Sequence, residues 1–226
     1  MTDNTVERGG APAHGRHIDM VARKARIAVL AIAVTAAVSA LGAGPAGAGV
    51  LVASAGDCTS PDSSEVFAPW MDPASYFLAP DGGFESGAAG WALDGASVAA
   101  ANSSYQVSGS GTQALALPSG SDATTPTICV GLEHPTIRFF ARRTSGGSLS
   151  SLRVDALIED NLGAISTVPV GVTGASGAWQ PGPQMVVAAS LLPLLPGDHT
   201  PVAFRFTAQG GSYLVDDVYV DPYAGR

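Results

Sequence analysis

The sequence predicts an all-β protein, a two-sheet antiparallel β-sandwich that follows a cleaved N-terminal signal segment. Short runs of alternating apolar and polar residues recur from Val66 onward, and a period of two is typical of strands with one buried face. Gly, Pro, Ser and Asp separate these runs, as expected of tight turns. No long window after the N-terminal segment has a helical period, so short strands packed in two sheets are favoured.

The first 48 residues are expected to form an N-terminal extension and a secretory signal peptide. Ile27–Leu41 is apolar and follows the basic residues Arg23, Lys24 and Arg26. Ala46–Ala48 then places small residues at the positions that signal peptidase reads. The alternative is a retained membrane anchor, but a spanning helix needs about 20 strongly apolar residues, and glycines and a proline interrupt residues 42–49. We therefore expect cleavage and a secreted, extracellular protein.

The remaining chain suits one domain. Residues 49–64 are rich in Ser, Asp, Gly and Ala and are expected to form a flexible arm. Residues 65–226 then form the sandwich, a length that supports a substantial core. From Gly49 onward the chain has six arginines and sixteen acidic residues, a net charge of −10. Such a surface repels phosphate, so we expect no nucleic-acid partner and, after cleavage, no membrane partner.

Two cysteines, Cys58 and Cys129, lie in the exported part. Because an even pair in an oxidising compartment usually forms a disulfide, we expect Cys58 to join the arm to the sheet. Closing so long a loop stabilises a fold by about 4 kcal/mol in the loop-entropy model. The alternative is a metal site with His134 and His199, although tetrahedral zinc needs four ligands.

Alternation defines the expected strands and their buried faces. Thr136–Arg142 places Ile137, Phe139 and Ala141 on one face. In the next runs, aliphatic and aromatic residues again occupy every second position, which marks the core face of each strand. The expected strands are Gly83–Gly87, Gln113–Leu117, Thr127–Val130, Thr136–Arg142, 152–158, 202–207 and Gly211–Pro222.

Residues at the two ends of the domain resemble a known family. These are Phe84-Glu85 with Trp91 after it, Gly177-Ala-Trp179, and the closing strand Val215-Asp216-Asp217-Val218. Together they resemble the jelly-roll carbohydrate-binding modules of the family 4/9/22 type, within the galactose-binding-like superfamily, over about Tyr76 to Pro222. The resemblance implies a jelly-roll sandwich. The chain is also similar to a group of secreted bacterial proteins of unassigned role.

The resemblance also implies a structural calcium ion, held by Glu85 and Asp216 where the first and last strands meet. Alternation places Asp216 on one face with Leu214, Val218 and Val220, and a carboxylate on a buried face must be paired, protonated or bound to a cation. The alternative is that Asp216 caps backbone amides at a bulge or lies in water at the rim. Asp217 shares the opposite face and is expected to be solvated.

Candidate ligand-binding residues lie on faces that alternation assigns away from the core. If their strands are neighbours, they form one surface that could hydrogen-bond sugar hydroxyls or an acidic sugar. The alternative is an ordinary solvated face with ion pairs, each worth under about 1 kcal/mol. Trp91 and Trp179 match core positions of the family, whereas Trp70 and Tyr105 remain possible surface aromatics. The candidate residues are Arg138, Phe140, Arg142, Arg153 and Arg205.

No catalytic motif is present in the exported part. It has no Gly-x-Ser-x-Gly elbow, phosphate loop or dinucleotide fingerprint, and the carboxylates are too numerous for their presence to indicate a glycosidase pair. We therefore expect a secreted, non-catalytic protein that recognises a polysaccharide or cell-wall glycan. The alternatives are a structural or protein-interaction domain without glycan affinity and a small hydrolase. The sequence does not indicate an oligomeric state.

Overall fold

The computed structural model describes residues 51, 62–131, 135–160, 162–187 and 199–221. Contacts divide the chain into Met1–Ala43, which lies outside the described residues, and Gly44–Arg226, which contains every strand that the structure describes. The expected signal peptide lies outside the described residues and stays a prediction, as does the flexible arm, of which only Leu51 and residues 62–64 are described. Among the described residues, no helix has the length and apolar character needed to cross a bilayer.

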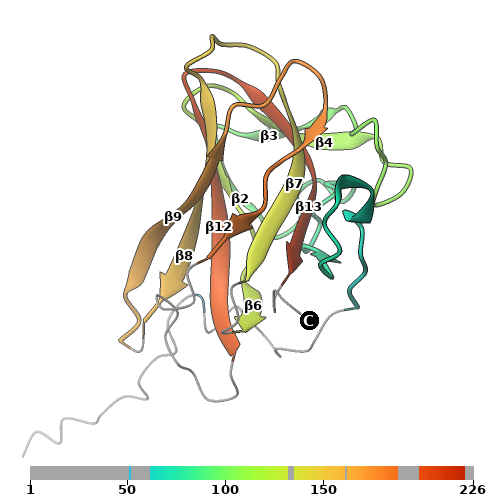
Figure 1. Ribbon diagram of the computed structural model, residues 1–226. Coiled ribbons are helices and arrows are strands. Elements are labelled where there is room, and N and C mark those ends of the chain that lie inside the picture. The colour runs from blue at the N-terminus through green and yellow to red at the C-terminus, as the bar shows by residue number, and fades with distance from the viewer. Residues whose placement is uncertain (1–50, 52–61, 132–134, 161, 188–198, 222–226) are drawn as a thin grey trace, which may run out of the picture. The chain divides into compact units, whose positions relative to one another are not determined.

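Two antiparallel sheets form a jelly-roll β-sandwich, as the sequence predicts (Figure 1). The seven-stranded sheet has the order β10-β7-β13-β4-β3, with β1 also paired to β13 and β11 to β7. Its strands are β1 (Phe77–Leu78), β3 (Ser97–Ala100), β4 (Gln113–Leu117), β7 (Thr136–Arg143), β10 (Gln180–Pro181), β11 (Met185–Val186) and β13 (Tyr213–Asp221).

The six-stranded sheet has the order β2-β5-β12-β8-β9, with β6 also paired to β12. The chain crosses repeatedly between the sheets, for example from β4 to β5, from β7 to β8 and from β12 to β13, and this crossing produces the jelly roll. Its strands are β2 (Ala92–Asp94), β5 (Asp122–Thr124), β6 (Ile128–Gly131), β8 (Ser151–Glu159), β9 (Ile165–Thr173) and β12 (His199–Gln209).

The main core lies between the two sheets. Phe139 of β7 and Phe206 of β12 meet edge to face across it, with ring centroids 5.0 Å apart, a geometry that aromatic pairs favour. Trp91 is buried in the same core against Phe84, as the sequence predicts. The alternating residues of β7, β8 and β12 also face this core, which confirms their predicted inward faces.

A strap, residues 64–78, covers the outer face of the seven-stranded sheet (Figure 1, teal). Paired hydrogen bonds between Ser64 and Tyr76 close it into a loop, which contains the short 3₁₀ helix η1 (Ala68–Trp70). A second apolar cluster lies beneath it, formed by Phe67, Tyr76, Phe140 and Tyr219. This face of the sheet is therefore partly buried by its own chain.

The predicted strand at Gly83–Gly87 is wrong, because residues 81–90 form turns. The turns nevertheless lie against β13. The Val218 amide donates to the Gly82 carbonyl at 3.0 Å, and a side chain at Gly82 would meet the Val218 carbonyl at 2.5 Å. Only glycine allows this approach. β1 pairs directly with β13, so the opening and closing segments of the domain lie side by side.

Candidate functional site

A row of aromatic rings lies on the outer face of the seven-stranded sheet, centred on Phe140 of β7. Trp70 of the strap and Tyr105 of the β3–β4 loop both contact Phe140, with centroids 5.3 Å and 5.0 Å away. Trp70 and Tyr105 meet edge to face at 5.2 Å. Phe140 is fully buried, whereas 43% of Tyr105 is exposed and Trp70 is half-buried. The rings of Trp70 and Tyr105 thus lie above Phe140, which supports both of them.

Trp179 extends this row on the β10 side. It immediately precedes β10, where Gln180 pairs with Ala141 of β7, and it packs against the same apolar cluster. The family-based expectation of core packing for Trp179 thus holds for this second cluster and not for the core between the sheets, and Trp179 is half-buried. The Arg142 guanidinium lies over the indole, 5.6 Å from its centroid, within the range of a cation–π contact. We call Trp70, Tyr105, Arg142 and Trp179 the aromatic ledge.

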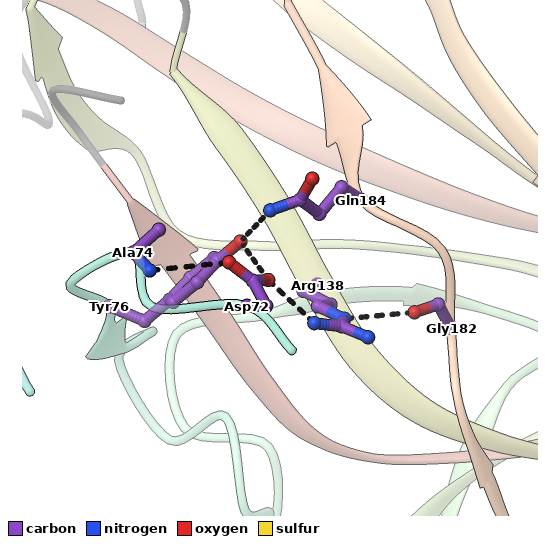
Figure 2. A network of polar contacts seen from close by, with 6 residues as sticks. All are labelled: Asp72, Ala74, Tyr76, Arg138, Gly182 and Gln184. Carbon is purple, nitrogen blue, oxygen red and sulfur yellow. Dashed lines mark hydrogen bonds and ion pairs between the residues drawn. The ribbon is translucent and has the colours of Figure 1, made fainter. Parts of the chain in front are cut away.

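Arg138 lies on the same face of β7 but is held by the strap (Figure 2). Its Nη1 lies 2.5 Å from Asp72 Oδ2, and its Nε donates to the Gly182 carbonyl at 3.0 Å. The guanidinium also lies 4.5 Å from the centroid of the Phe67 ring. Only 8% of Arg138 is exposed, so this side chain has its partners within the fold.

Asp72 and Tyr76 complete this buried network. The Tyr76 hydroxyl donates to Asp72 Oδ2 at 2.9 Å and accepts from Gln184 Nε2 at 3.3 Å (Figure 2). Burial raises the pKa of the Tyr76 hydroxyl well above its ordinary value. The network fixes the strap to β7. Sequence alternation could not find it, because Asp72 and Arg138 lie 66 residues apart in the chain.

Arg153 and Arg205 belong to the other sheet, so the expected single arginine surface does not exist. Arg153 lies on β8 and Arg205 on β12, and both form ion pairs with Asp155, at 2.7 Å and 3.7 Å. The other three candidates, Arg138, Phe140 and Arg142, lie on β7 of the seven-stranded sheet. The chain passes from one sheet to the other between β7 and β8. Outward-facing arginines that look equivalent in the sequence therefore lie on opposite faces of the sandwich.

A group of three carboxylates lies where the β13 bulge meets the turns of residues 81–90. Glu85 is exposed, and its Oε1 accepts from the Thr112 and Gln113 amides at 2.7 Å and 2.8 Å. These hydrogen bonds lower the pKa of Glu85, because they favour the charged form. Burial raises the pKa of Asp216 and of Asp217, and the nearby Glu85 charge adds to both rises.

Asp216 is fully buried. Its Oδ2 accepts from the Ser103 amide at 2.6 Å and its Oδ1 from the Asp217 amide at 2.8 Å. Burial raises the pKa of Asp216 to about 7, and the Asp217 and Glu85 charges add to that rise while the Ser103 amide opposes it. The carboxylate thus caps backbone amides at a bulge, which was the sequence-based alternative to calcium binding.

The expectation that Asp217 is solvated is wrong, because the side chain is 1% exposed. The pairing of β13 with β7 shifts between Asp216 and Tyr219, and Asp217 has a φ of 51°. This bulge changes the alternation, so Val215 and Val218 face the main core while Leu214 and Asp216 do not. One extra residue in a strand turns every following side chain to the opposite face.

The three carboxylates partly fit a cation. The Asp217 Oδ2 is buried without a hydrogen-bond partner, and an unpartnered anionic oxygen among like charges is the donor that Ca²⁺ prefers. However, the described residues contain no group of three or more Asp, Glu, His or Cys side chains converging on one point. A calcium ion would therefore also need oxygen from backbone carbonyls or water.

Two other sequence-based candidates, the disulfide and the alternative metal site, lie partly outside the described residues. Cys129 lies on β6, but Cys58 lies outside the described residues, so their disulfide stays a prediction. His134 also lies outside them, and only the backbone of His199, on β12, is described.

No protein-family model and no curated protein matches the sequence. Solved structures with a similar fold include the xylan-binding CBM22-1 domain of Paenibacillus barcinonensis Xyn10C, at 15% identity and a TM-score of 0.46, covering 66% of this chain and 99% of that domain. The CBM22-1-GH10 modules of Clostridium thermocellum Xyn10B, complexed with xylohexaose, give 12% identity and a TM-score of 0.46. The match covers 64% of this chain and 28% of that one. TmCBM61 with β-1,4-galactotriose gives 16% identity and a TM-score of 0.40, covering 63% and 96%. These values carry no functional assignment, which must come from this chain's own residues.

Proposed function

We propose that this protein is a secreted, non-catalytic glycan-recognition protein and that the aromatic ledge is its binding surface. The observation that supports this most directly is the pair of partly exposed rings, Trp70 and Tyr105, on buried Phe140. The apolar face of a pyranose ring packs on Trp and Tyr, whose polar atoms remain available to its hydroxyls. Support from below holds the rings in place, which reduces the ordering cost of binding.

The placement of the acids supports recognition over hydrolysis. Glu85 has a lowered pKa and Asp216 a raised one, which is the contrast expected of a catalytic pair. However, Asp216 is closed to solvent and both of its oxygens accept backbone amides. A substrate could not reach it without unfolding the bulge, so these acids suit a structural role.

Affinity electrophoresis of the exported protein in gels that contain single polysaccharides tests the proposal. Tyr105→Ala should reduce the retardation that a bound polysaccharide causes, because it removes an exposed ring of the ledge. Leu149→Ala is a matched control, since Leu149 is 97% exposed on the β7–β8 loop and outside the ledge. Migration that no polysaccharide changes would instead support a structural or protein-interaction domain.

We also propose that the three carboxylates near the β13 bulge hold a structural Ca²⁺ ion. The proposal is supported by the raised pKa of buried Asp216, to which burial contributes most and the Asp217 and Glu85 charges add, and by the unpartnered Asp217 Oδ2. Calcium would neutralise these charges and tie the turns of residues 81–90 to β13. Thermal melting after chelation and after addition of Ca²⁺ tests it, and an identical midpoint in both conditions would contradict it.

A further inference from the structure

Arg142 differs from the other arginines that the structure describes. Arg138 is paired with Asp72, and Arg153 and Arg205 are paired with Asp155. Arg143 donates to the Gly147 carbonyl at 2.8 Å. Within the described residues the Arg142 side chain makes no ion pair or hydrogen bond, and its Nε is buried without an acceptor. A buried N–H that lacks an acceptor destabilises the fold, so the described residues leave the Arg142 guanidinium as a donor group that they do not satisfy.

The surroundings of Arg142 indicate what that partner is. The guanidinium lies over the Trp179 indole, and Arg142 shares a face of β7 with Phe140, on which Tyr105 and Trp70 rest. The unpaired cation therefore belongs to the aromatic ledge. A planar guanidinium fixed against a ring presents a fork of N–H donors, which matches the two oxygens of a carboxylate.

We infer that Arg142 binds the carboxylate of an acidic sugar, so that the ligand is a polysaccharide containing uronic acid residues. This inference rests on the proposed function and narrows its ligand class. The net charge of −10 after residue 48 means that general electrostatic attraction cannot hold a polyanion on this protein. Recognition would have to come from local contact, with the sugar ring on Tyr105 or Trp70 and its carboxylate on Arg142.

The test compares one polysaccharide in two chemical forms. A uronate polymer such as glucuronoxylan or polygalacturonate is used intact and after reduction of its carboxyl groups to neutral hydroxymethyl groups. The exported protein should bind the intact form at least about tenfold more tightly in calorimetry or affinity electrophoresis, because a charge-assisted hydrogen bond is lost with the carboxylate.

Two variants test whether a preference for the intact polymer comes from Arg142. Arg142→Gln should bind both forms equally, whereas Arg143→Gln, which changes the net charge by the same amount one residue away, should keep the preference. Thermal melting of both variants verifies that each is folded.

Equal binding of the intact and reduced polymers by the unaltered protein would overturn this inference while leaving glycan recognition intact. A preference that persists in Arg142→Gln would also overturn it. If neither these polymers nor any neutral polysaccharide were bound, the proposed function itself would fail.

Discussion

Arg138 of β7 and Asp72 of the strap form a buried ion pair, with Nη1 2.5 Å from Oδ2 (Figure 2). The pair joins β7 to the strap. Because Trp70 lies two residues before Asp72 in the strap, the pair also helps to hold Trp70 over Phe140. The position of the ledge thus depends on a contact outside the ledge. The strap is therefore needed for the candidate site, because it carries Trp70.

Breaking this pair should destabilise the protein strongly. Asp72→Asn leaves the Arg138 cation buried without its counter-charge, and the expected loss is about 3 kcal/mol or more in free energy of unfolding, measured by urea denaturation. The double variant Asp72→Asn with Arg138→Met should recover much of that loss, because no buried charge remains. A double variant less stable than Asp72→Asn would show that the charge itself is not the cause.

Tyr76 should make stability depend on alkaline pH. Burial raises the pKa of its hydroxyl in the folded state, so folding favours the protonated form. Its contribution is complete below about pH 10, the ordinary value in an unfolded chain, and is lost as the pH rises through the raised pKa. Urea denaturation between pH 8 and 11 should show this decline.

Tyr76→Phe is the control for that pH dependence. The variant should lose about 1 kcal/mol at neutral pH with the hydroxyl's hydrogen bonds, and its stability should decline less steeply above pH 10. Some decline should remain, because burial also raises the pKa of Tyr219 to about 12. An equally steep decline in the variant would show that Tyr76 is not responsible.

Gly82→Ala should destabilise the contact between the turns and β13. The added methyl group would lie 2.5 Å from the Val218 carbonyl, which forces the backbone to move, and overpacking of this kind costs about 1–3 kcal/mol. Gly147→Ala provides the comparison, since no atom lies within 4 Å of a side chain there. A melting temperature lowered equally in both variants would contradict the prediction.

Asp217→Asn should separate the effect of calcium from that of charge repulsion. The amide oxygen can still accept from Ser108, while the amide nitrogen occupies the unpartnered position. In chelator the variant should be as stable as the unaltered protein or more so, because one of three like charges is removed. Added Ca²⁺ should raise the melting temperature of the unaltered protein and leave the variant's almost unchanged. A rise of equal size in both would place the ion elsewhere.

The local pattern predicted the inward faces of the central strands. Ile137 and Phe139 of β7, Val154 of β8 and Phe204 of β12 are all buried in the main core, because side chains alternate strictly in an undisturbed strand. The same rule failed at Asp217, because the bulge after Asp216 depends on how β13 pairs with β7. Pairing register is a property of two strands together and cannot be read from one.

By itself, the sequence determined that the chain makes short strands with defined apolar faces and that residues 49–226 are acidic. Only the tertiary structure decided which outward-facing residues remain accessible. Phe140 and Arg138 alternate with core residues just as Arg142 does, yet the strap buries the first two and leaves Arg142 beside Trp179. The physical reason is that alternation records which side of a strand a residue occupies, whereas exposure depends on what a distant segment of the chain places over that side.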